Sequence, residues 1–276
     1  MARAIKHIKA GLLNTRVIGD IPEREPGRRR SGRCRPACEA MQFYNDKCSW
    51  RELELKLAAN YRGRDLVLTT TYDDPHLPAD KRAADRELQK LIRKLRAARR
   101  KRGEELRYIY ATEGWHGKAE DAYFGGDGRL EDKRLHHHLV INGTGPGDLE
   151  EIRSLWGGGG YVRAEPVDVH YYRELAKYLT KEAREFGRAR PGERSWRGSR
   201  NLKKYEVEYI EIPGDGVTLS APQGAVDYVQ FSERNPYGFA DCVGDRYLLF
   251  EVEARPEYSY TLGRTRKSKN SNNFST

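Results

Sequence analysis

Apolar and polar residues follow two different periods along this chain. Over residues 80–102 the apolar residues recur every three or four positions, which places them on one stripe of a helix, while charged residues cover the rest of its surface. The stripe consists of Ala84, Leu88, Leu91, Leu95 and Ala98. Gly103 follows directly, and glycine commonly ends a helix. The pattern therefore predicts one long amphipathic helix over residues 80–102.

Shorter segments have the composition of strands. Residues 65–72 (DLVLTTTY) are apolar and β-branched, as in a buried strand, and residues 204–212 (KYEVEYIEI) alternate between apolar and polar. The predicted strands cover residues 65–72, 106–113, 135–142, 161–167 and 204–212. Two further helices are predicted over residues 149–156 and 170–186.

The two ends of the chain lack a clear period. Residues 1–40 are rich in Arg, Pro and Gly, so we expect a basic, flexible N-terminal arm with structure starting near Gln42. Residues 255–276 are basic and then rich in Ser and Asn, so we expect a disordered tail. This leaves residues 41–254 as one domain with a C-terminal extension. A loop of about 20 residues before residue 135 is long enough to suggest a functional role.

The charge distribution points to an anionic partner. The net charge is +10 and the sequence pI is about 9.4. Residues 90–102 hold eight basic and no acidic residues, and residues 184–204 hold eight basic and two acidic ones. Such clusters attract phosphate backbones. An acidic membrane surface is the competing partner, but no apolar run could span a bilayer and no signal-peptide core is visible, so we expect a cytoplasmic protein.

These clusters supply the candidates for DNA binding. The basic candidates are Arg96, Arg99, Arg100, Arg197, Arg200 and Lys203. Trp196 and Tyr123 are candidates for stacking on bases, with ordinary packing as the alternative for both.

Four cysteines are too few for a disulfide scaffold in a chain of 276 residues. Cys34, Cys38 and Cys48 lie close enough in sequence for a small zinc site, although unpaired thiols are the simpler interpretation.

The sequence His136-His137-His138 is the strongest chemical signal. In a strand, alternate side chains share a face, so His136 and His138 point one way and His137 the other. Two imidazoles on one face can hold a divalent cation. Glu113, at the end of the preceding strand, is the preferred third ligand, and a carboxylate suits Mg²⁺ or Mn²⁺. His116 could be a fourth ligand or a plain surface residue.

Tyr178 and Lys181 are three residues apart on a predicted helix and therefore share a face. A tyrosine hydroxyl, with a pKa of about 10, is a poor nucleophile until its negative charge is stabilised, which a nearby lysine and metal would do. Tyr171 and Tyr172 are better explained as core or base-stacking residues, with a helper role left open.

Taken together and in this order, these motifs resemble the HUH endonucleases, and in particular the rolling-circle replication initiators of phages, plasmids and integrative elements. The resemblance covers residues 42–205 and rests on DLVLTTTY, YIYATE, RLHHHLVIN, LAKYLTKE and SWRGSRNLKK. It implies an α+β fold of the ferredoxin-like or RRM-like type, with a central antiparallel sheet and flanking helices. It further implies that a metal polarises a phosphate of single-stranded origin DNA and that the tyrosine attacks it, which leaves a 5′-phosphotyrosine and a 3′-hydroxyl primer.

Several alternatives stay open at this point. The same chemistry would serve a conjugative relaxase or a transposase. A zinc metallohydrolase without covalent tyrosine chemistry and a non-enzymatic DNA-binding protein are the alternatives from other classes. The nucleotide-binding pattern G-x-x-x-x-G-K-[ST] is absent, so an initiator of this kind would need a host helicase as partner.

Overall fold

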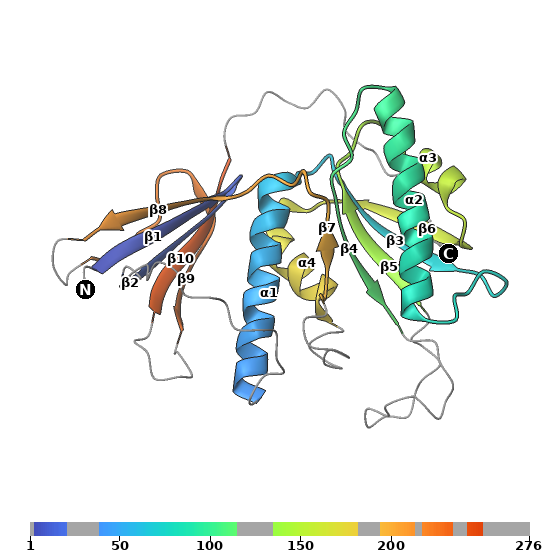
Figure 1. Ribbon diagram of the computed structural model, residues 1–276. Coiled ribbons are helices and arrows are strands. Elements are labelled where there is room, and N and C mark those ends of the chain that lie inside the picture. Colours follow the sequence, from blue (N-terminus) through green and yellow to red (C-terminus); the bar gives the residue numbers. More distant parts are fainter. Residues whose placement is uncertain are drawn as a thin grey trace, which may run out of the picture.

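The computed structural model describes residues 3–20, 39–114, 135–181, 194–212, 217–233 and 242–250. Within these ranges the chain forms two five-stranded sheets and four α-helices (Figure 1). Every strand pairing is antiparallel. The predicted α+β class is therefore confirmed, and the chain carries one sheet more than the resemblance implied.

The first sheet contains the strands that were predicted from residues 65–167. Its strands follow the order β6-β3-β5-β4-β7. The bounds are β3 Leu66–Tyr72, β4 Tyr108–Glu113, β5 His136–Ile141, β6 Gly159–Pro166 and β7 Arg197–Gly198. Because β5 lies in the middle, it is paired on both edges and buried on both faces.

Helices cover both faces of this sheet. Helices α2 (Lys81–Lys101) and α3 (Asp148–Leu155) pack on one face, and α1 (Glu39–Asn60) and α4 (Tyr172–Leu179) pack on the other, between the two sheets (Figure 1). Helix α2 confirms the predicted amphipathic helix, since its apolar stripe is buried against the sheet. Asp80 caps it by accepting a hydrogen bond from the Ala83 amide, and Gly103, with φ of +77°, follows its end.

The second sheet includes a part of the chain where no regular structure was predicted. Its order is β8-β1-β2-β10-β9. The bounds are β1 Arg3–Ala10, β2 Leu13–Asp20, β8 Glu206–Glu211, β9 Ala225–Glu233 and β10 Cys242–Leu249. The expectation of a flexible arm is therefore wrong for residues 3–20, and structure begins well before Gln42. The partners of β1 and β2 are β8 and β10, some 200 residues later in sequence, so a local pattern could not reveal the pairing. Residues 21–38 and 251–276 lie outside the described residues.

The helix predicted over residues 170–186 is shorter where it is described. A 3₁₀ turn (η2, Val169–Tyr171) leads into α4. Tyr172 is fully buried, and its hydroxyl donates to the carbonyl of Tyr61 on the α1 side, so it is a core residue as expected. Tyr171 is 58% exposed. None of the described helices is both long and apolar enough to cross a membrane.

His137 lies in the core on the α2 side of β5. Its Nε2 is 2.7 Å from the Tyr72 hydroxyl and its Nδ1 is 2.9 Å from Thr112 Oγ1. Thr112 donates its single hydroxyl proton to Asp85, so it accepts from the histidine, whose proton is therefore on Nδ1. Tyr72 then donates to the bare Nε2. Both ring nitrogens are thus satisfied in a neutral imidazole, which anchors β5 with its neighbouring histidines facing away from α2.

Arg99 is also buried, which contradicts its assignment to DNA binding. Its guanidinium is fully enclosed, donates to the Asn142 carbonyl at 2.7 Å and lies 3.2 Å from Asp148 at the start of α3. These partners draw the side chain from the last turn of α2 into the interior. The arginine therefore joins α2, α3 and the end of β5.

Acid should destabilise the protein through His137. Burial, reinforced by His136 and His138, lowers the pKa of its imidazole to about 3, whereas an unfolded histidine has a pKa of about 6.5. Between these values the unfolded state binds one more proton, so stability rises with pH and is lost as pH falls through 6.5. We expect the free energy of unfolding, measured with urea in EDTA, to fall by about 2 kcal/mol between pH 7 and pH 5. His137→Gln should lose most of this pH dependence; a fall as steep as in the wild type would contradict the assignment.

Replacing Arg99 should affect stability. Arg99→Gln leaves Asp148 buried without its ionic partner, so we expect a loss of about 3 kcal/mol in the free energy of unfolding, measured by circular dichroism in urea. Arg100→Gln is the matched control, because Arg100 is the exposed neighbour and its loss should change stability by less than about 0.5 kcal/mol. Equal effects of the two substitutions would refute the structural role of Arg99.

Candidate metal centre and its tyrosine

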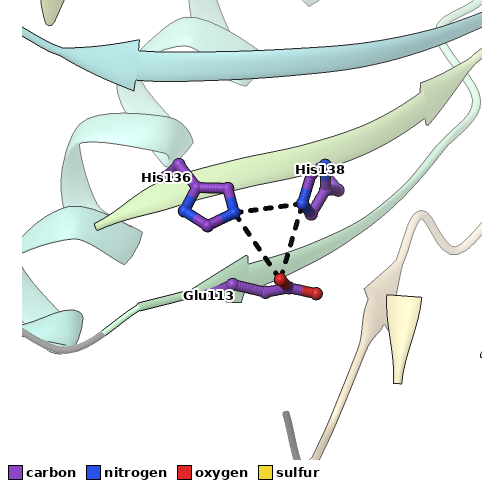
Figure 2. Close-up of side chains that lie close together, drawn as sticks. All are labelled: Glu113, His136 and His138. Atoms are coloured by element: carbon purple, nitrogen blue, oxygen red, sulfur yellow. Dashed lines mark hydrogen bonds and ion pairs between the residues drawn. The ribbon is translucent and has the colours of Figure 1, made fainter. Parts of the chain in front are cut away.

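The register of two strands brings the three predicted ligands together. In the pairing of β4 with β5, Glu113 lies opposite His136, and Ala111 lies opposite His138. The side chains of Glu113, His136 and His138 therefore project from the same face and converge, as Figure 2 shows. This face is the one covered by α4, opposite to the face that holds His137.

The distances within this triad suit a metal ion. The two Nε2 atoms of His136 and His138 are 3.1 Å apart, and Glu113 Oε2 lies 3.5 Å from each (Figure 2). Two ligand atoms at right angles around an ion, each bound at about 2.1 Å, lie about 3 Å apart, so one divalent cation fits between these groups. Glu113 Oε1 is buried and makes no hydrogen bond, which leaves a carboxylate oxygen whose lone pairs the protein does not satisfy. The predicted ligand set could therefore hold a metal ion.

Thr69 orients the more buried of the two histidines. Its Oγ1 lies 3.1 Å from His138 Nδ1, and β3 pairs directly with β5 at this position. Holding one ring nitrogen in this way directs the other, Nε2, toward Glu113. The sequence analysis did not identify Thr69, although its place in the alternating segment DLVLTTTY was the available signal.

Glu113 is charged in spite of its burial. Burial by itself would raise the pKa of this carboxyl, but hydrogen bonds from His136, His138 and Lys181 outweigh that effect and hold its pKa far below the usual range. Lys181 Nζ is 2.9 Å from Glu113 Oε2. A permanently ionised carboxylate is therefore available at the centre of the cluster.

Tyr178 reaches into the same cluster from α4. Its hydroxyl is 3.1 Å from His138 Nε2, and its ring packs edge-on against that imidazole. Lys181 Nζ lies 3.9 Å from the centre of the Tyr178 ring. Burial would lower the pKa of Lys181, but Glu113 and Tyr178 raise it above the ordinary value, so the lysine stays protonated. Four residues predicted to act at one site, together with Tyr178, thus lie in direct contact with one another.

The predicted DNA-binding residues are spread over the molecule. Arg96 and Arg100 lie on α2, across the sheet from the triad, and Arg96 is placed over the Tyr108 ring. Arg197, in β7, bonds to Asp85 and Tyr110, also on the α2 side. None of these three residues is therefore adjacent to the triad.

The remaining candidates give a mixed picture. Arg200 and Lys203 are exposed in the segment after β7, and Trp196 is partly buried against the core beside α1. His116 and Tyr123 lie outside the described residues, and so do Cys34 and Cys38; Cys48 is an exposed, unpaired thiol. The zinc hypothesis for the cysteines stays a prediction.

Comparison with known proteins gives one match. A family of replication-associated proteins, described as the ORF2 type, matches residues 65–183, from β3 through α4, which includes the whole cluster. No curated protein and no solved structure matches the chain. The match supports a replication-associated protein, and the residues it covers hold a His-His-Glu cluster compatible with a metal-dependent nuclease.

Proposed function

We propose that this protein initiates rolling-circle replication by nicking and rejoining single-stranded origin DNA. The observation that carries the proposal is the position of Tyr178, whose hydroxyl lies 3.1 Å from His138 Nε2 at the edge of a triad suited to a divalent metal. A nucleophile in contact with a metal ligand stands where a phosphate bound to that metal would be attacked. The family match over the same residues supports replication as the setting.

In the proposed reaction, the oxygen of Tyr178 attacks the phosphorus of the scissile phosphodiester. A bond forms between the tyrosine oxygen and phosphorus, and the bond between phosphorus and the 3′-oxygen breaks. The departing 3′-oxygen takes up a proton and becomes the primer hydroxyl. The 5′ end stays on the tyrosine as a phosphodiester, so the strand can be rejoined without another energy source.

Glu113, His136 and His138 would hold Mg²⁺ or Mn²⁺, which would supply a Lewis acid for the phosphoryl oxygens. The protein's own part is orientation: Thr69 and the strand register aim the two imidazoles, and the buried carboxylate carries the negative charge that attracts the ion. Lys181 lies against the Tyr178 ring and so stabilises the negative charge that develops on its oxygen.

Three alternatives are less well supported. A zinc hydrolase that activates water has no use for a tyrosine in contact with a metal ligand. A DNA-binding protein without activity leaves the buried, unsatisfied oxygen of Glu113 unexplained. A relaxase or transposase would use the same cluster, and the family match favours the initiator. A host helicase belongs to the proposal as the partner that unwinds the duplex.

Metal binding should depend on the triad. We expect calorimetric titration with Mn²⁺ to show one site in the wild type and at least a hundredfold weaker binding in His136→Ala/His138→Ala, because two of three protein ligands are lost. Glu113→Gln should weaken binding by at least tenfold. His7→Ala, on the second sheet, is the control and should bind as the wild type does. Undiminished Mn²⁺ binding by the double variant would rule out this centre.

Covalent attachment should depend on Tyr178. With Mn²⁺ and a single-stranded origin oligonucleotide, we expect a protein–DNA adduct in denaturing gels, with the modification on Tyr178 by mass spectrometry. Tyr178→Phe should form none, whereas Tyr171→Phe, which removes an exposed tyrosine seven residues earlier, should keep it. Lys181→Met should slow adduct formation by about a hundredfold, since it removes the charge beside the phenolate. An adduct that persists in Tyr178→Phe would contradict the mechanism.

A further inference from the structure

Three cations gather around one tryptophan where α1 packs against α4. Arg51, Arg173 and Lys177 lie 5.6, 5.8 and 5.3 Å from the centre of the Trp50 ring, measured from Cζ of each arginine and Nζ of the lysine. Each is within the distance at which a cation is attracted to an aromatic face. Trp50 thus holds together three positive groups that would otherwise repel one another.

Two of these cations continue toward the candidate site. Arg173, Lys177 and Lys181 are spaced four residues apart, so they form a row along the side of α4, with successive members about 6 Å apart along the helix axis. The row ends at Lys181, which contacts both Glu113 and the Tyr178 ring. The cations around Trp50 are therefore connected to the nucleophile by one helix face.

The Arg173 end of this row shares its carboxylate with a second arginine. Arg173 Nε is buried without a hydrogen bond and lies 3.5 Å from Glu54, a carboxylate that bonds more closely to Arg246, at 2.9 Å. One buried carboxylate therefore serves two guanidinium groups. Glu174 is the acidic residue within the row's span, and it is exposed.

From this arrangement we propose that the surface formed by Trp50, Arg51, Arg173 and Lys177 binds the phosphates of the single strand next to the position cut by Tyr178. A line of cations at regular intervals beside an aromatic ring is how proteins grip an extended strand without reading its sequence. The inference rests on the proposed function in taking single-stranded DNA as the ligand. It places the binding surface on α1 and α4, and it assigns no such role to the basic helix α2.

The test measures binding without cleavage. A fluorescein-labelled dT20 oligonucleotide is titrated in EDTA, and the fluorescence anisotropy is followed at several salt concentrations. Arg173→Gln/Lys177→Gln should bind about tenfold more weakly, and the slope of log affinity against log salt should be less steep by about 1.4, since two phosphate contacts are lost. The matched control is Arg86→Gln/Arg93→Gln, which removes the same charge from exposed positions of α2 and should change affinity by less than twofold.

Two further variants separate charge from geometry. Trp50→Leu keeps every cation but releases them from the ring, so affinity should fall by about fivefold with the salt slope unchanged, and Trp50→Phe should restore most of it. Glu174→Gln removes a negative charge and should strengthen binding. Mn²⁺ binding by Arg173→Gln/Lys177→Gln should stay within twofold of the wild type, which shows that the fold is retained.

The results distinguish this surface from the proposed chemistry. If Arg173→Gln/Lys177→Gln loses no more affinity than the α2 control, the surface is refuted, while adduct formation by Tyr178 stands on its own experiment. If the variant loses affinity as expected but the wild type forms no adduct, the surface is supported and the nicking mechanism fails.

Discussion

The alternation of side chains along β5 divides three consecutive histidines between two environments, and the rest of the site depends on that division. His137 enters the core on the α2 side, where Tyr72 and Thr112 satisfy both its nitrogens. His136 and His138 consequently face α4. Because β5 is paired on both edges, a slip of one residue would exchange the two faces and would disturb two strand pairings at once. The core histidine thus keeps the two candidate ligands in register with Glu113.

Glu113 is the point at which the electrostatics of the site meet. Its Oε2 faces two imidazoles and the ammonium group of Lys181, while its Oε1 is buried without a partner. A divalent ion bound here would compete with Lys181 for the same carboxylate. As the carboxylate is drawn to the ion, more of the lysine's charge becomes available to the Tyr178 ring beside it. In the proposed mechanism, metal binding and activation of the nucleophile are therefore coupled through one side chain.

Local periodicity was enough to predict the first sheet and the metal ligands. Residues 65–72, 106–113 and 135–142 carry strong strand patterns, and the period of two along His136–His138 identifies which imidazoles share a face. It failed for β1 and β2, whose partners lie some 200 residues away, because pairing over that distance leaves no local mark. It also misplaced Arg99: a basic residue in the last turn of a helix looks exposed until Asp148 and Asn142, from another segment, enclose it.

Charge density in the sequence is a poor guide to where an anion binds, because a helix can carry many cations and still lie on the wrong face of a sheet. Helix α2 is the most basic segment of the chain, yet the sheet separates it from the triad. Helix α4 carries fewer cations, but it also carries Tyr178, and its row from Arg173 to Lys181 ends at Glu113. The distance over which a charge acts in salt solution is about 8 Å, comparable to the thickness of one layer of side chains. A phosphate at the triad would therefore interact with α4 far more strongly than with α2, whatever the number of arginines on each.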